Sequence, residues 1–210
     1  MKLIEALKCE KLADEIATNV EISPALYDAF CTVSRSEFVS ISAYAFDLNP
    51  QPILANQWIS SPLTVAKMTM ALELDGVDKV LEIGCGSGYQ AAILSKIVRR
   101  VFTIERIEKL VNEAKKHFEN LGILNIHLLY NDGNCGWKKY APYERILLSA
   151  AAKEIDERLL DQLEVGGILV APLESEGFQK IIKIRKFDEK NYQEEILEPC
   201  IFVPLLKGVE

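Results

Sequence analysis

Histidine, paired cysteine and long apolar runs are all scarce in this chain of 210 residues. It contains two histidines, and its five cysteines lie far apart with no C-x-x-C pair. We therefore expect neither a disulfide framework nor a metal site, and reduced thiols are typical of a cytoplasmic protein. No apolar run approaches the ~20 residues of a membrane-spanning helix, and residues 1–17 alternate charged and apolar side chains. We expect no signal peptide and no membrane contact.

Dense clusters of positive charge are also missing. The formal net charge is −7, and the basic runs at 138–139 and 180–186 are short. Because nucleic-acid-binding surfaces concentrate Lys and Arg, we expect no nucleic-acid partner.

With 49% hydrophobic and 26% charged residues the composition is that of an ordinary globular protein, and the length suits one α/β domain with modest additions. We expect a monomer.

The N-terminal part predicts helices and one long loop. Apolar residues recur at helical spacing over 3–16, and Ser23-Pro24 is typical of an N-cap and first-turn proline. The segment 46–61 contains two prolines and few helix signals, which indicates a loop or a short extended segment. We expect a helical preface with this loop (1–61) and a core (62–210) within one domain.

The core alternates strands with helices. The predicted strands cover 78–83, 101–104, 126–129, 145–148 and 167–171, and the helices cover 62–74, 107–121 and 155–163, the last ended by Gly166-Gly167. This alternation predicts an α/β fold with a doubly wound, Rossmann-like, mostly parallel sheet and helices on both faces. Segments 182–187 and 195–203 flank a polar stretch and predict a C-terminal antiparallel hairpin.

A glycine-rich turn follows the first core strand. Gly84, Gly86 and Gly88 stand between a predicted strand and a predicted helix. Glycines permit a tight turn, let a ligand approach the backbone, and leave helix amides pointing at that ligand. G-x-G-x-G alone is a weak signal, so its neighbours must support the assignment. Between the glycines, Cys85 is expected to be a small packed residue rather than a reactive thiol.

Acidic residues end the next two predicted strands. Glu105 lies where a carboxylate can accept ribose hydroxyl protons. Asp132-Gly133 lies where a carboxylate can receive an adenine amino group and a glycine leaves room for the ring. Glu82, before the first glycine, favours S-adenosylmethionine over NAD because a sulfonium cation gains from a nearby carboxylate. The alternative is that Glu105 and Asp132 only cap helices.

These motifs are part of a longer pattern that resembles the protein-L-isoaspartate O-methyltransferases, a family of class I S-adenosylmethionine-dependent methyltransferases, over nearly the whole chain. Residues 80–92 are similar to the family's V-L-E-I-G-x-G-S-G-Y-Q-x-A, and 57–62 resemble its Q-T-I-S-x-P. Further similar segments are Arg35 to Val39 (R-x-x-F-V), Asp132-Gly133 with Gly136-Trp137 and Ala141-Pro142-Tyr143, and Phe202 to Leu205.

The resemblance implies an enzyme that transfers a methyl group from S-adenosylmethionine to the free carboxylate of L-isoaspartyl residues in damaged proteins or peptides, which initiates their repair. It implies Ser60 as the active-site hydroxyl that positions the substrate carboxylate, with Gln57, Ile59 and Val203 as substrate-contact candidates. An ionised carboxylate needs alignment more than a general base, and neither histidine is near a motif. Ser60 could instead cap the following helix, unless Ser61 does so.

Residues 56–60, which we call the substrate lip, depart from the family's Gly-Gln-Thr-Ile-Ser by Asn56 and Trp58. Asn131 replaces a glycine before Asp132, and Glu144-Arg145 replaces Asp-Ala. Two alternatives therefore stay open: a methyltransferase of a different substrate, or a protein that binds S-adenosylmethionine without turnover because Trp58 closes the entrance. An NAD-dependent oxidoreductase is the last choice, since no proton-relay histidine is evident.

Overall fold

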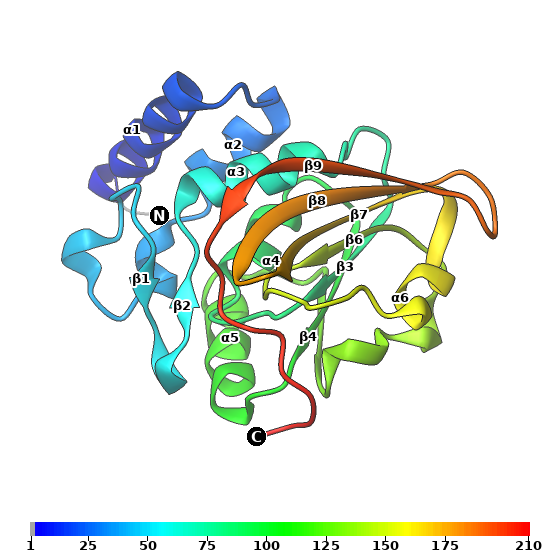
Figure 1. Cartoon of the computed structure of the whole chain (residues 1–210). Coiled ribbons are helices and arrows are strands. Elements are labelled where there is room, and N and C mark those ends of the chain that lie inside the picture. Colours follow the sequence, from blue (N-terminus) through cyan, green and yellow to red (C-terminus); the bar gives the residue numbers. More distant parts are fainter. Residues whose placement is uncertain (1–2) are drawn as a thin grey trace.

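The computed structural model describes residues 3–210, and within them seven strands form one sheet in the order β5-β4-β3-β6-β7-β8-β9 (Figure 1). Pairing is parallel from β5 to β7 and antiparallel from β7 to β9, so the predicted mostly parallel sheet with a C-terminal hairpin is confirmed. The strands are β3 (Lys79–Ile83), β4 (Arg100–Glu105), β5 (Ile126–Tyr130), β6 (Tyr143–Leu148), β7 (Leu163–Ser175), β8 (Phe178–Lys186) and β9 (Tyr192–Cys200).

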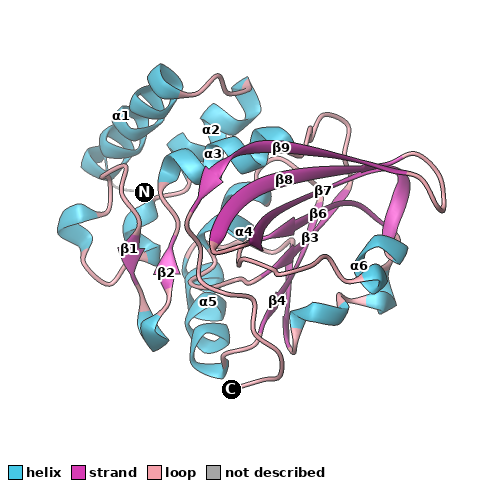
Figure 2. Ribbon diagram, in the orientation of Figure 1, coloured by secondary structure: helices cyan, strands magenta, loops and turns pink. Residues whose placement is uncertain are grey.

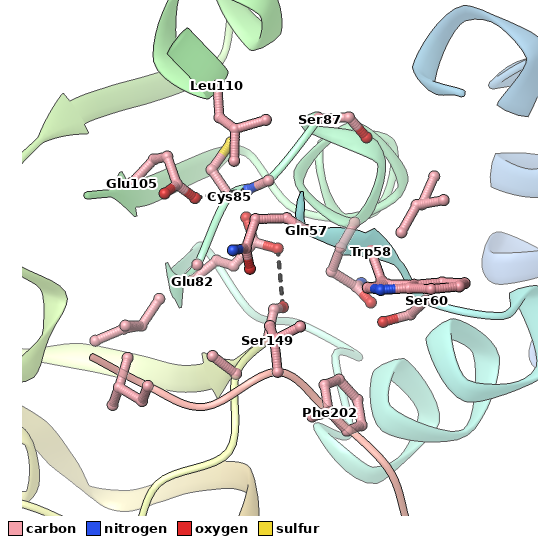
Figure 3. A pocket seen from close by; sticks show the side chains of 18 of the residues that line it. Gln57, Trp58, Ser60, Glu82, Cys85, Ser87, Glu105, Leu110, Ser149 and Phe202 are labelled. Carbon is pink, nitrogen blue, oxygen red and sulfur yellow. Dashed lines mark hydrogen bonds between the residues drawn. The ribbon is translucent and has the colours of Figure 1, made fainter. Parts of the chain in front are cut away.

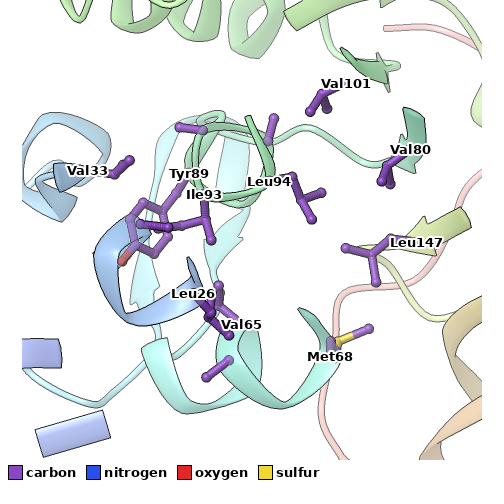
Figure 4. Packing of buried hydrophobic residues seen from close by; sticks show 14 of the residues in the cluster. Leu26, Val33, Val65, Met68, Val80, Tyr89, Ile93, Leu94, Val101 and Leu147 are labelled. Carbon is purple, nitrogen blue, oxygen red and sulfur yellow. The ribbon is translucent and has the colours of Figure 1, made fainter. Parts of the chain in front are cut away.

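The two faces of the sheet are covered unequally (Figure 2). Alternate residues of a strand point to opposite faces. Val80 and Val101 point to the face that packs on the longer helices, with Leu94 and Val65 in the same core (Figure 4). That face carries α1 (Leu3–Asn19), α2 (Pro24–Thr32), α3 (Pro62–Ala71), α4 (Tyr89–Leu94) and α5 (Glu108–Asn120). Leu81 points to the other face, under α6 (Glu157–Asp161) and two 3₁₀ helices, Gly133–Cys135 and Lys138–Tyr140.

The order of the strands reverses at β3, which has β4 on one side and β6 on the other. In open α/β sheets a crevice forms at such a switch point, beyond the carboxyl ends of the strands. The turn that leaves β3 is the glycine-rich segment, so the fold directs any ligand of that turn to this crevice.

One predicted boundary is wrong at the glycine pair before β7. Gly166 and Gly167 do not end the preceding helix, because α6 stops at Asp161 and β7 already begins at Leu163. The glycines lie inside β7, where the register against β6 shifts. A Cβ on Gly167 would lie 2.7 Å from the Glu164 carbonyl oxygen, so the close approach of backbone within this bulge requires a glycine.

The hairpin is also offset from its predicted bounds, because β8 begins at Phe178 and β9 ends at Cys200. Beyond Cys200 the backbone amide of Phe202 donates to the side chain of Gln179 instead of continuing the strand pairing. The chain then turns across the sheet, and Pro204 bridges to Ala151 after β6. The C-terminal segment thereby reaches the switch point.

The loop 46–61 folds into a two-stranded hairpin of β1 (Gln51–Pro52) and β2 (Trp58–Ile59). Ala55 and Asn56 in its turn both have positive φ, 57° and 54°. Two successive residues with positive φ are the requirement of a type I′ turn, and asparagine tolerates that region better than other residues with a side chain. Asn56 therefore tolerates the positive φ of this position, at which the family pattern has a glycine.

Candidate active site

A pocket opens at the switch point, between the carboxyl ends of β3, β4 and β6 and the substrate lip (Figure 3). The lip lies over it from the β1–β2 hairpin, and residues 202–206 of the C-terminal segment complete its wall. Nine of the predicted site residues line it: Gln57, Ile59, Ser60, Glu82, Gly84, Gly86, Glu105, Gly133 and Val203. Residues far apart in the sequence, from the substrate lip to Val203, thus meet at one crevice.

The glycine-rich turn is held by backbone bonds to β4. The amides of Gly84 and Cys85 both donate to the Ile104 carbonyl oxygen, at 2.9 and 3.1 Å. Gly84 and Gly86 have φ values of 94° and 56°, which a glycine adopts without strain. Cys85 is buried, and that burial raises the pKa of its thiol well above the usual value, as expected for a packed residue.

Glu105 joins the end of β4 to the glycine-rich turn. Its Oε2 accepts from the Gly86 amide at 2.8 Å, and its Oε1 accepts from the Ile107 amide at 2.9 Å. The side chain is 5% exposed, and burial raises the pKa of this carboxyl even though the amide bonds oppose the shift. Each oxygen keeps a lone pair, so Glu105 can order the turn and still accept a hydrogen bond from a ligand hydroxyl.

Glu82 is the most deeply buried acid of the pocket. Thr103 Oγ1 donates to its Oε2 at 2.6 Å. Ser149 Oγ donates to its Oε1 at 3.2 Å, the bond drawn in Figure 3. Burial is the dominant influence and raises the pKa of Glu82 to about 8. Within residues 3–210 no cation pairs with this carboxylate. A cationic ligand in the pocket would supply the missing partner.

Gly88 and Asp132 were predicted to contact the cofactor, but neither lines the pocket. Gly88 precedes α4, and a Cβ there would lie 2.7 Å from the ring of Phe118 on α5, so its glycine serves helix packing. The Asp132 carboxylate caps a 3₁₀ helix by accepting from the amide of Asn134 at 2.9 Å, and it also accepts from the Gly208 amide at 2.7 Å. The capping alternative therefore describes its contacts.

Ser60 faces the pocket beside the N-terminus of α3. Ser61 is the N-cap of α3, because its Oγ accepts from the Thr64 amide at 3.1 Å. Capping therefore leaves the Ser60 hydroxyl available, and no residue among 3–210 forms a hydrogen bond with it. Across the pocket the Val203 carbonyl accepts from the Ala151 amide at 2.8 Å, which fixes that backbone at the pocket wall.

The model of the protein-L-isoaspartate(D-aspartate) O-methyltransferase family matches residues 7–210. A protein-L-isoaspartate O-methyltransferase of Helicobacter pylori is 48% identical over 209 residues, covering 99% of this chain and all 100% of the relative. One of Desulfosudis oleivorans is 45% identical over 199 residues, covering 94% and 90%. The chain belongs to this family.

Solved structures agree with the family's fold. A protein-L-isoaspartate O-methyltransferase with 26% identity superposes with a TM-score of 0.87, covering 96% of this chain and 67% of the other. A second structure, from Plasmodium falciparum and described as a protein-L-isoaspartate O-methyltransferase in complex with S-adenosyl-L-homocysteine, has 20% identity and a TM-score of 0.85, covering 95% and 98%. The Plasmodium falciparum structure shows that this chain shares its fold.

The departures from the family pattern fall into two groups. Trp58 is 54% exposed and lines the pocket close to Ser60, so this change lies at the mouth of the pocket (Figure 3). Glu144 and Arg145 lie at the other end of β6, outside the pocket lining. There Glu144 Oε2 accepts from the Asp78 and Lys79 amides, both at 2.9 Å, so Glu144 anchors the start of β3.

Sequence reasoning missed two contacts of this methyltransferase-family site. Ser149 follows β6, and the strand-end rule that selected Glu105 would have selected it as well. His117 was expected to be remote from every motif, which is wrong: its Nδ1 donates to the Ser87 carbonyl oxygen of the glycine-rich turn at 2.8 Å. The helical pattern of α5 gave no signal for this contact, because it depends on how α5 packs against the turn.

Across 3–210 no group of histidine, cysteine, aspartate and glutamate side chains has the arrangement of a metal site. In the same range, none of the helices combines the length and the apolar character needed to cross a membrane.

Proposed function

We propose that this chain is an enzyme that transfers the methyl group of S-adenosylmethionine to the free carboxylate of L-isoaspartyl residues in damaged proteins and peptides, the step that begins their repair. The observation that carries the proposal is that the substrate lip and the ends of β3, β4 and β6 share one pocket, in a chain that matches the family over 7–210.

The inner part of the pocket suits S-adenosylmethionine. Glu105 offers its remaining lone pairs to ribose hydroxyls, and Glu82, buried without a cationic partner among residues 3–210, is matched to a positively charged ligand. Gly84, Gly86 and Gly133 line the pocket without adding a side chain to it. Bound there, S-adenosylmethionine would supply an electrophilic methyl group. The S-adenosyl-L-homocysteine complex of the Plasmodium falciparum structure supports this assignment.

Asp132 stays a prediction for the adenine amino group. Its Oδ2 already accepts from the Gly208 amide but has a second lone pair. Contact with a base would therefore need either that lone pair or a displacement of the C-terminal segment.

The outer part of the pocket positions the second reactant. A carboxylate is the nucleophile and needs no general base, so the protein contributes alignment and exclusion of water. Ser60 donates a hydrogen bond to the substrate carboxylate, while Gln57, Ile59 and the Val203 backbone form the walls around the isoaspartyl residue. Trp58 forms the exposed rim where flanking residues of a peptide enter.

We further propose one monomeric domain in the cytoplasm, with the helical preface 1–61 and the core 62–210 acting as a unit. Buried residues of α1, α2 and β3 belong to the same hydrophobic cluster, which supports a single folding unit. Cys31, Cys85, Cys135 and Cys200 are free thiols, which supports a reducing compartment.

The decisive experiment supplies labelled S-adenosylmethionine with two peptides that differ only in an aspartyl or isoaspartyl linkage. We expect a base-labile methyl ester on the isoaspartyl peptide alone. Ser60→Ala should lower incorporation ~10²-fold, since one positioning bond is lost, with cofactor affinity nearly unchanged.

Ser61→Ala is the matched control, because its hydroxyl caps α3 and should affect stability rather than methyl transfer. Wild-type protein that binds the cofactor but methylates neither peptide would refute the proposal. That outcome would favour a different substrate or a binding protein without turnover.

A further inference from the structure

Arg35 is a cation sealed inside the protein, with 0% of its surface exposed. Burying a charge costs several kcal/mol unless it is paired or fully hydrogen-bonded. Within residues 3–210 no carboxylate forms an ion pair with Arg35, and burial lowers the pKa of its guanidinium. Something other than an acid must stabilise this side chain.

Four backbone carbonyls instead solvate the two terminal nitrogens of the guanidinium. Its Nη1 donates to the carbonyls of Ala45 at 2.9 Å and Asp47 at 3.2 Å. Its Nη2 donates to the carbonyls of Asn49 at 3.0 Å and Ser60 at 3.0 Å. Both ends of the loop that carries the substrate lip are therefore attached to one side chain.

The bond to Ser60 falls at a gap between regular elements. The pairing of β2 ends at Ile59, and α3 begins at Pro62, whose predecessor Ser61 is the N-cap. Between these two elements the Ser60 carbonyl is fixed by Arg35. The orientation of the Ser60 hydroxyl follows from that backbone, because χ1 is the only rotor between them.

The other side of Arg35 faces the helix that follows the glycine-rich turn. Its guanidinium lies 5.9 Å from the ring centre of Tyr89, the first residue of α4 after the glycine-rich turn. Phe38, in the same 3₁₀ helix as Arg35, also packs on Tyr89 with ring centres 5.5 Å apart. Arg35 thus lies between the residue that follows the glycines and the carbonyl of Ser60.

We propose that Arg35 is a positioning residue for methyl transfer: it sets the place of Ser60 relative to the glycine-rich turn by binding the carbonyls of the lip segment. The expected effect on methyl transfer rests on the proposed function, whereas the fixing of the lip segment by Arg35 does not. The R-x-x-F spacing has a physical reason, because residues three apart on a 3₁₀ helix lie on one side and here both contact Tyr89.

The test compares Arg35→Lys and Arg35→Met with Arg145→Lys. Arg145 is a matched control because it also donates to backbone carbonyls, those of Glu73 and Glu144, and lies outside the pocket lining. Lysine keeps the charge but cannot span four carbonyls. For Arg35→Lys we expect kcat to fall ~30–100-fold, a raised KM for the isoaspartyl peptide and a nearly unchanged cofactor Kd.

Arg35→Met should be slower still, so that lysine restores part of the activity. Arg145→Lys should keep the wild-type kcat. A folded Arg35→Lys variant with wild-type kcat, or an equal loss in Arg145→Lys, would overturn the proposal. If Arg35→Met does not fold, Arg35→Lys against Arg145→Lys decides.

A readout independent of catalysis uses the lip itself. The chain has two tryptophans, so Trp137→Phe leaves Trp58 as the only reporter. We expect acrylamide to quench Trp58 more strongly in Arg35→Lys than in the parent or in Arg145→Lys. Should the wild type methylate neither peptide, stronger quenching would still support the positioning role, and equal quenching would refute it.

Discussion

Glu105 joins two segments of the protein and is also the proposed acceptor for the ribose of the cofactor. Its two oxygens each accept a backbone amide, one from the glycine-rich turn and one from the segment that opens α5. A substitution there would therefore change the shape of the turn and also remove the hydrogen bonds that the carboxylate would accept from ribose hydroxyls.

We expect Glu105→Gln to weaken S-adenosyl-L-homocysteine binding by ~1–3 kcal/mol. The glutamine NH2 group would replace one carboxylate oxygen and would then face a backbone N–H, so that two donors oppose each other. Titration calorimetry measures this, with Glu119→Gln on the exposed surface of α5 as the control. The protein should still fold. An unchanged Kd in the folded Gln variant would limit Glu105 to a structural acid.

At the scale of elements, the packing of α5 against the residues that precede α4 helps to set the position of the glycine-rich turn. Gly88 precedes α4 with φ of 95°, and the Phe118 ring of α5 fills the space where a side chain would be. His117, on the same helix, binds the Ser87 carbonyl. The turn is therefore held by α5 as well as by β4.

Gly88→Ala should lower the free energy of unfolding by ~2–4 kcal/mol, from backbone strain plus a clash with Phe118 at 2.7 Å. Gly122→Ala is the control, since Gly122 also has positive φ, 62°, but open space around it. That variant should lose ~1 kcal/mol. Urea denaturation compares the two, and equal losses would show that the helix contact tolerates a methyl group.

At the scale of the whole molecule, buried and paired carboxyls give stability opposite dependences on pH. Arg185 and Lys183 lower the pKa of Glu73 to about 2, so its contribution is lost as pH falls below its ordinary value of 4.5. Burial raises the pKa of Glu82 from 4.5 to about 8, so the folded protein retains a proton that the unfolded chain releases. This second contribution declines as pH rises from about 4.5 to 8.

For the ligand-free protein we expect the free energy of unfolding to decrease between pH 5 and pH 8, with a slope of at most ~1.4 kcal/mol per pH unit from Glu82. Glu82→Gln removes that titration and should flatten the curve over the same range. Denaturation at several pH values tests it. Parallel curves for the two proteins would place the titration on another group.

Local patterns sufficed for the parallel sheet, the glycine-rich turn and Glu105. Strand and helix periodicities are local, and in parallel sheets the carboxyl ends of neighbouring strands meet at one edge, so residues after β3 and β4 had to be close. The N-cap role of Ser61 could also be expected from the sequence, because the capping hydroxyl and the Thr64 amide that it accepts from lie three residues apart.

The tertiary structure alone decided which distant groups Asp132, Gly88 and Arg35 contact, as well as the burial of Glu82. Their partners are far away in sequence: a C-terminal amide for Asp132, a ring of α5 for Gly88, and four carbonyls spread over residues 45–60 for Arg35. Burial likewise depends on what every other element covers, and that burial raises the pKa of Glu82. The sequence by itself determined the fold class and, to within one residue, the carboxyl ends of β3, β4, β5 and β6. Packing determined which polar groups those ends leave available to a ligand.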